Sequence, residues 1–362
     1  MRSIFFFLCG IQLLWAQSTG VTPQWELSLF RGNVMPHSPD LYHLQGHPEG
    51  VMLAYNWQTH GSKEWHRTYD NPNYGIYLLY QDFNNRFLGQ SWAVGGQFQF
   101  FFLNRHVRLT TAAGVAYMNQ PYDKVTNSKN KAFGSPLLAN INLGLHYQIP
   151  LFRSPWTMQA GFLFTHYSNG RTKSPNSGIN SYGLNLGLTY SSPKSAEKAI
   201  STLAKDTINY RQPWHYNIVA RTGVNESSVI NSGQYPFLHL GAYVDKRLNR
   251  KSGLQFGVDV FLTQSLKDFI RYKSAAFPED QIDPDTDYRR VGLFAGYEWY
   301  INRLSFEAQV GYYVYDRLQN DIPIYDRIGL KYYWTPKVYS SLSLKTHLFL
   351  AEAIEWGIGI RL

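Results

Sequence analysis

The sequence predicts an all-β protein, an antiparallel transmembrane β-barrel of about 16 strands, and three observations lead to this fold class. Aromatic residues make up 16% of the 362 residues, with 27 Tyr and 10 Trp, while charged residues account for only 16%. That charged fraction is below the roughly 25% usual in soluble domains. Mean hydropathy is nevertheless −0.33, because polar and apolar residues alternate. This pattern is typical of strands with one lipid face and one wet face.

The first 20 residues have the pattern of a signal peptide. Arg2 gives a basic start, residues 4–15 form a mostly apolar run, and Ala16 supplies a small residue for cleavage. The run is too short for a membrane helix, and no later stretch reaches the roughly 20 apolar residues that such a helix needs. Cys9, the only cysteine, lies in this segment. We therefore expect neither a disulfide nor a Cys nucleophile in the exported protein.

The net charge of +9 and the isoelectric point near 9.3 indicate an anionic partner. For an exported chain, a membrane surface or a lipid headgroup fits this charge better than nucleic acid does. We therefore expect no nucleic-acid binding.

Several segments alternate so regularly that both strand faces can be assigned. Between residues 137 and 149, the odd positions are apolar and most even positions are polar, and residues 254–262 and 304–314 repeat the pattern. An even number of strands places both ends of a closed barrel in the periplasm. The expected strands are 24–34, 49–59, 74–82, 89–103, 106–118, 136–149, 156–168, 180–191, 213–222, 235–246, 252–263, 289–301, 303–316, 325–335, 337–349 and 353–362.

Loop lengths predict the orientation, because such barrels have short turns in the periplasm and long loops outside. The long loops near 119–135, 169–179, 223–234 and 264–288 are therefore placed outside the cell. The long connection at 193–212 falls in the periplasm, and its apolar residues recur at helical spacing, which predicts a short amphipathic helix.

This connection divides the chain into a signal peptide at 1–20, barrel strands in 21–192, the connecting segment at 193–212, and the remaining strands in 213–362. We favour one large barrel that uses all strands. Two eight-stranded barrels in tandem, or one barrel of 12–14 strands, are the alternatives.

The stretch 161–180 ends an expected strand with polar residues of the kind that hydrolases use. Residues two apart in a strand share a face, so the apolar face that contains Phe164 continues to His166 and Ser168. On the next expected strand, Asn180 belongs to the apolar face. A His, a Ser and an Asn are therefore expected on adjacent strands, outside the barrel and level with the outer-leaflet headgroups.

These residue types predict nucleophilic ester hydrolysis. Ser168 would attack, His166 would take and return the proton, and Asn180 would orient the other imidazole nitrogen. Amide donors for a developing oxyanion come from three further residues, namely Asn169, Gly170 and Asn176. The alternative interpretation is a strand end whose polar side chains merely reach water.

The same residues resemble the signature of the outer-membrane lipid A 3-O-deacylases, the PagL type, which are also described as acyloxyacyl hydrolase-like. The resemblance rests on residues 166–170, 175–178 and Asn180, and it extends over 24–192. It implies hydrolysis of the ester at the 3-position of lipid A, with release of a 3-hydroxy fatty acid and without a metal or other cofactor. His166 and Ser168 carry over to their family roles.

One departure from the family pattern concerns Asn180, where the family usually has a Glu. An amide can accept a hydrogen bond from the imidazole and hold its tautomer, but it cannot stabilise an imidazolium with a full charge. We therefore expect a working but slower catalytic triad.

The interval from residue 124 to residue 196 contains no Asp or Glu. Its basic residues in the long loops are expected to attract lipid A phosphates, and the same charges also suit general contact with an anionic outer leaflet. These residues are Lys124, Lys129, Lys131, Arg171 and Lys173.

Two other clusters are not interpreted as metal sites. The histidines of the first loops match no compact ligand spacing, and the acidic residues between 279 and 287 lack the glycine and the final Glu of an EF-hand. The histidines are His37, His43, His47, His60 and His66.

The sequence thus predicts a lipid A deacylase in the outer membrane of a diderm bacterium. The alternative is a porin-like or structural barrel in which the site is vestigial, and a conductance measurement would separate the two.

Overall fold

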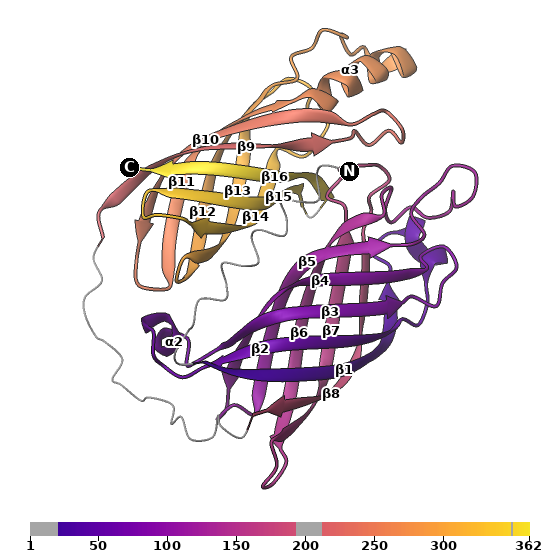
Figure 1. Ribbon diagram of the computed structural model, residues 1–362. Helices are drawn as coiled ribbons and strands as arrows, with labels where there is room; N and C mark the ends of the chain where they lie inside the picture. The colour runs from indigo at the N-terminus through magenta and orange to yellow at the C-terminus, as the bar shows by residue number, and fades with distance from the viewer. Residues whose placement is uncertain (1–20, 193–211, 349) are drawn as a thin grey trace, which may run out of the picture.

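The computed structural model describes residues 21–192, 212–348 and 350–362, and within them it contains two closed barrels of eight antiparallel strands each (Figure 1). The strands of the first barrel are β1 (Val21–Met35), β2 (Glu49–Thr59), β3 (Asn73–Asp82), β4 (Gln90–Phe102), β5 (Val107–Met118), β6 (Leu137–Pro150), β7 (Trp156–Ser168) and β8 (Ile179–Ser191). The strands of the second are β9 (Trp214–Asn225), β10 (Tyr235–Arg247), β11 (Ser252–Thr263), β12 (Arg290–Ile301), β13 (Leu304–Asp316), β14 (Ile324–Tyr333), β15 (Val338–His347) and β16 (Leu350–Arg361).

The all-β class and the alternative of two eight-stranded barrels are confirmed. The preference for one large barrel is wrong, as is a barrel of 12–14 strands, because the sheet closes after eight strands. β8 pairs with β1 from Gln24 opposite Ser191 to Met35 opposite Asn180. β16 likewise pairs with β9. Each barrel thus satisfies the hydrogen bonds of its own edge strands, and neither has an edge left for the other.

The outer faces of both barrels are apolar. Leu184 and Leu186 on β8 are each 60% exposed, and Ile358 on β16 is 68% exposed. Side chains on the opposite faces of these strands point into the lumen and are polar, as Asn185 shows. Apolar outside and polar inside is the pattern of a barrel that meets lipid.

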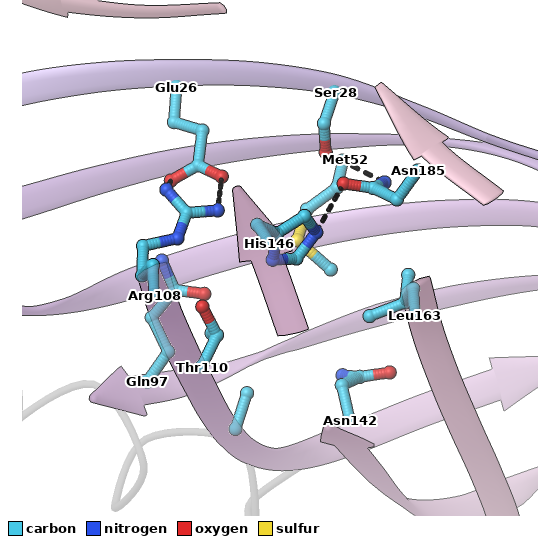
Figure 2. Close-up of a pocket in the computed structure, with 11 residues that line it drawn as sticks. Glu26, Ser28, Met52, Gln97, Arg108, Thr110, Asn142, His146, Leu163 and Asn185 are labelled. Atoms are coloured by element: carbon cyan, nitrogen blue, oxygen red, sulfur yellow. Dashed lines mark hydrogen bonds and ion pairs between the residues drawn. The ribbon is translucent and has the colours of Figure 1, made fainter. Parts of the chain in front are cut away.

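The lumen of the first barrel is filled at the level of Glu26. Figure 2 shows Arg108 turned toward Glu26, with an Nη2–Oε1 distance of 2.8 Å, and His146 beside Asn185. Gln99 Nε2 also donates to the Glu26 carboxylate, at 2.8 Å. The cavity among these side chains has a volume of about 10 Å³, which is room for one water molecule.

The lumen of the second barrel is crossed by fully buried ion pairs. Arg327 lies 2.7 Å from an oxygen of Asp259 and 2.7 Å from an oxygen of Glu355. Lys331 Nζ lies 3.1 Å from Glu298 and 2.8 Å from Glu307. Because every one of these charges has an opposite partner, the barrel interior can hold them without water.

Short helices occupy some of the connections: η2 (Pro39–Leu44), α2 (Glu64–Thr68), α3 (Gln264–Ala276) and η4 (Pro278–Asp280). None of the helices in the described part of the chain has the length and apolar character needed to cross a membrane. Sequence reasoning missed α3, although Leu266, Phe269 and Ile270 recur there at helical spacing. The expected signal peptide and the expected helix in 193–212 lie outside the described residues, apart from Gln212.

The two barrels are in contact at the end where the turns are short. The Tyr69 hydroxyl donates to the backbone oxygen of Tyr300 at 2.5 Å, and its ring lies 5.6 Å from that of Trp299. Glu64 of α2 forms an ion pair with Arg250. Aromatic packing and an ion pair therefore fix one end of the first barrel against the second.

Replacing Lys331 with Met should destabilise the second barrel by about 3–5 kcal/mol, because Glu298 and Glu307 would lose their buried cation. The measurement is the temperature at which the folded form disappears on semi-native electrophoresis. Lys337→Met, at an exposed turn position, is the matched control and should leave this temperature unchanged. Equal temperatures for the two variants would show that the buried ion pairs contribute little.

Candidate active site

His166 and Ser168 lie at the end of β7, on the outer face of the first barrel. The lumen side of β7 is defined by Thr165 and Tyr167, which are buried and bond to lumen groups. Because strand residues alternate, His166 and Ser168 point the other way. His166 is half-buried, and Ser168 is only 5% exposed, since the long loops at this end cover the strand.

Asn180 lies directly across from His166 on β8. The distance from His166 Nδ1 to Asn180 Oδ1 is 2.6 Å. An amide oxygen can only accept, so this contact assigns the imidazole proton to Nδ1 and leaves Nε2 as the basic nitrogen. That is the tautomer a general base needs.

The chain of contacts continues to His37, in the loop after β1. Asn180 Nδ2 lies 3.4 Å from His37 Nδ1, and His37 Nε2 lies 2.9 Å from the backbone oxygen of Ser177. The amide nitrogen can only donate and the backbone oxygen can only accept, so all three contacts agree with one arrangement of protons. His37 thereby fixes which atom the Asn180 amide presents to His166.

The Ser168 hydroxyl is held by its own loop. It donates to Asn176 Oδ1 at 3.2 Å and accepts from Asn176 Nδ2 at 3.0 Å and from the Gly170 backbone N–H at 3.0 Å. Among the described residues, its hydrogen bonds do not include His166. Without substrate, catalytic hydrogen bonds are often absent or long.

The three expected oxyanion donors surround the same hydroxyl. The Asn169 backbone N–H donates to Asn176 Oδ1 at 2.9 Å. Asn169 is itself anchored, because its side-chain nitrogen donates to Ser135 Oγ at 3.1 Å and to the Lys173 backbone oxygen at 2.7 Å. Gly170 has a φ of +60°, which aims its N–H back at Ser168. The loop therefore concentrates N–H donors within reach of one oxygen.

The basic residues predicted to bind substrate lie in the loops around this site. Backbone bonds join the loops: Ser177 N donates to the Lys131 oxygen at 3.3 Å. The Lys131 ammonium lies over the Tyr122 ring at 5.2 Å, and the Lys129 ammonium over the Phe87 ring at 5.7 Å.

Two more basic residues, Arg171 and Lys173, belong to the loop that follows Ser168. Arg171 has a φ of +60°. Lys173 is exposed. The pKa of the Asp123 carboxyl is lowered mainly because the Thr126 and Val125 backbone N–H groups donate to it, and the charge of Lys173 adds to this effect. The structure shows no contact between these four cations and Ser168 among the residues it describes.

The histidines of the early loops do not converge. His43 Nε2 lies 2.6 Å from the Lys129 oxygen, His47 Nδ1 lies 2.8 Å from Asn33 Oδ1, and His66 belongs to α2 at the opposite end. No three His, Cys, Asp or Glu side chains in the described ranges are arranged to hold a metal ion.

Sequence reasoning missed the position of His37 because it favoured one large barrel. In such a barrel β8 would pair with β9, and the loop after β1 would lie elsewhere. Closure after eight strands instead places Met35 opposite Asn180, and His37 follows two residues later. The prediction of two eight-stranded barrels would have placed His37 beside Asn180.

Two closed β-barrels with apolar outer faces have the architecture of a membrane β-barrel protein, and a Ser, a His and an Asn lie together at one end of the first barrel. Comparison with curated proteins finds none that matches the sequence. Among solved structures, the outer-membrane enzyme PagL is 18% identical, with 45% of this chain and 97% of that chain covered and a TM-score of 0.34. A variant of Rhodopseudomonas blastica porin is 11% identical, with 94% and 100% covered and a TM-score of 0.20.

Two family matches lie in the chain, one in each barrel. Residues 49–189 match the family described as lipid A 3-O-deacylase (PagL). Residues 214–362 match the family described as acyloxyacyl hydrolase, C-terminal domain. The chain is thus similar to the lipid A 3-O-deacylase (PagL) family in its first barrel and to the acyloxyacyl hydrolase C-terminal domain in its second.

Proposed function

We propose that the protein is an outer-membrane enzyme that hydrolyses the ester-linked acyl chain at the 3-O position of lipid A. The observation that carries the proposal is the 2.6 Å contact between His166 and Asn180, beside Ser168 on the outer face of a barrel. The family match of residues 49–189 supports the same substrate. We also propose that residues 1–20 direct export and that the long loops lie outside the cell.

The outward position of these side chains supports a lipid substrate. Polar groups that face hydrocarbon are costly unless they have partners, and a lumen position would be the ordinary place for them. On the outer face, near the loops, they would lie at the level of the ester bonds of an outer-leaflet lipid. The substrate would reach the site by lateral diffusion in the membrane.

In the proposed mechanism, Ser168 turns its hydroxyl from Asn176 to His166 Nε2. As Nε2 takes the proton, the Ser168 oxygen attacks the ester carbonyl carbon and a tetrahedral intermediate forms. Asn180 holds the proton on His166 Nδ1 throughout, so the ring stays in the basic tautomer. His166 then gives its proton to the 3-hydroxyl oxygen of the sugar, which leaves as the alcohol.

The charge on the carbonyl oxygen would be stabilised by the donors that surround Ser168. The Gly170 backbone N–H already lies 3.0 Å from the Ser168 hydroxyl. The Asn176 Nδ2 group becomes available when Ser168 turns away from it, while the Asn169 N–H keeps its bond to Asn176 Oδ1 and holds that amide in place. Pre-arranged donors of this kind contribute on the order of 10²-fold or more each to the rate.

Hydrolysis of the acyl-enzyme repeats the same chemistry with water. His166 accepts a proton from the water as it attacks the acyl carbon, and it returns the proton to Ser168 as the fatty acid leaves. Apart from this water and the substrate, every group in the scheme belongs to the protein. Lys129, Lys131, Arg171 and Lys173 would bind the phosphates of lipid A through long-range attraction.

The alternative, a porin-like barrel, requires an open lumen. The first lumen is filled around Glu26, with a cavity of about 10 Å³, and the second is crossed by fully buried ion pairs such as Arg327 with Glu355. Both observations favour the enzyme. Reconstituted protein is expected to give no stepwise conductance in planar bilayers.

Ser168→Ala should abolish deacylation, because it removes the attacking oxygen. We expect the rate to fall by at least about 10³-fold, with the barrels still folded. The measurement is mass spectrometry of lipid A from cells that express each form. Ser154→Ala, in the exposed turn at the other end of β7, is the control and should trim lipid A like the wild type. Wild-type spectra from the Ser168→Ala strain would reject the proposed function.

Asn180→Ala should lower kcat by about 10-fold or more, because His166 would lose the acceptor that fixes its tautomer. Asn180→Glu should keep or raise kcat, since a carboxylate also stabilises the imidazolium. His37→Ala should lower kcat less than Asn180→Ala does, and it should add little to that variant, because both act on one contact chain. Steady-state kinetics on purified protein measure these effects. Unchanged kcat in both alanine variants would remove Asn180 from the mechanism.

A further inference from the structure

We propose that the second barrel positions the nucleophile loop of the first barrel, with Glu226 as the positioning residue and Ile354 as the surface that the loop packs against. The nucleophile loop is residues 169–178. The inference rests on the proposed function, because the geometry that it concerns is that of Ser168 and its donors.

The second half of the nucleophile loop is tied to the first barrel. Gly178 N donates to the Ala132 oxygen at 2.8 Å, and Ser177 N donates to the Lys131 oxygen at 3.3 Å. The Asn176 side chain holds Ser168 and Asn169. Residues 170–174 have bonds to residues 168 and 169 at the strand end: Asn169 Nδ2 donates to the Lys173 oxygen at 2.7 Å, and Thr172 N donates to the Asn169 oxygen at 3.1 Å.

Residues of the loop between β9 and β10, in the second barrel, also hold that first half. The Glu226 backbone N–H donates to the Arg171 oxygen at 3.0 Å. The Ser174 hydroxyl donates to the Ser227 oxygen at 2.6 Å, and Gln234 Nε2 donates to the Thr172 oxygen at 2.7 Å. Bonds from one barrel thus reach three residues of the other barrel's loop: Arg171, Thr172 and Ser174.

Glu226 makes the central contact of this group. Its side chain is buried, with the residue 2% exposed. Oxygen Oε2 accepts from Ser174 N at 2.7 Å, and Oε1 accepts from Gly233 N at 3.2 Å. A buried carboxylate that accepts two backbone N–H bonds joins the two loops rigidly, because both oxygens are fixed in direction. Glu226 also brings a negative charge to a loop region in which the first barrel has none between residues 124 and 192.

Gly170 packs against the outer wall of the second barrel. A Cβ at Gly170 would lie 2.2 Å from Ile354 Cγ1 and 3.3 Å from Leu344 Cδ1, so these side chains touch the glycine backbone. Leu344 and Ile354 face each other on β15 and β16, and both are only half-exposed, whereas Ile358 on the same face of β16 is 68% exposed. The nucleophile loop accounts for this difference in cover.

Gly170 connects the contact with the second barrel directly to Ser168. The Gly170 N–H donates to Ser168 Oγ at 3.0 Å, and the adjacent Gly170 Cα rests on Ile354. A shift of the loop by about 1 Å would misalign this donor, and misplacement of that size can reduce a rate by about 10²-fold. The second barrel therefore acts on the transition state through the loop and not by touching the substrate.

The first test replaces Glu226 with Gln in the full-length protein. The amide would set an N–H donor against a backbone N–H donor, so one of the two bonds is lost. We expect kcat per folded molecule to fall about 10-fold or more, with KM changed less than about 2-fold. Glu226→Asp keeps both acceptor oxygens and should recover part of kcat. Glu279→Gln, at an exposed carboxylate of η4, is the matched control and should have wild-type kcat.

The second test uses the Gly170 contact and remains decisive if Glu226→Gln does not fold. Gly170→Ala should lower kcat, because the new methyl group collides with Ile354 and the φ of +60° is strained for Ala. Adding Ile354→Ala should restore part of the lost kcat, whereas adding Ile358→Ala should restore none. Recovery in the first double variant alone would place the contact between the two barrels in the catalytic pathway.

The results of these tests distinguish a failure of the positioning role from a failure of the proposed function. If Ser168→Ala is inactive while Glu226→Gln keeps the wild-type kcat, or changes KM alone, the positioning role is wrong and the proposed function stands. The same holds if Ile354→Ala gives Gly170→Ala no recovery. If Ser168→Ala itself remains active, the proposed function fails first.

Discussion

The pairing of β8 with β1 is the constraint on which the rest of the structure depends. Twelve residue pairs, from Gln24 with Ser191 to Met35 with Asn180, close the sheet after eight strands. Because of this closure the remaining strands form a barrel of their own, and the two barrels meet through their outer walls and loops. The same pairing carries His37 to Asn180, and so it completes the contact chain behind His166.

The parts of the fold that depend on local periodicity could be predicted from the sequence. The alternation along β6, β7 and β8 gave the strand positions and placed His166, Ser168 and Asn180 on one face, because side-chain direction in a strand repeats every two residues. Closure could not be read in this way. An eight-stranded and a 16-stranded barrel have the same alternation, and only the partner of β8 differs. His37 and Glu226 depend on that partner, and neither was found.

The lumen of the second barrel contributes stability, and the outer face of the first barrel carries the candidate site. Inside, charges such as Arg327, Asp259 and Glu355 are paired and buried, and they hold the walls together. Outside, the polar groups near Ser168 are few, and each is held by a neighbour: Asn180 by His37, and Asn176 by Ser168 itself. The paired charges in the lumen stabilise the barrel wall. Because the wall is stable, the polar side chains near Ser168 keep their positions on its apolar outer face.

The surroundings of the nucleophile loop include the second barrel as well as the first. The pairings within each barrel are made by consecutive strands and one closing pair, so either sheet can close by itself. The hydrogen bonds between residues 226–227 and residues 171–174 join a loop of one sheet to a loop of the other. The arrangement around Ser168 thus involves both barrels, whereas the strand that carries Ser168 is complete within the first.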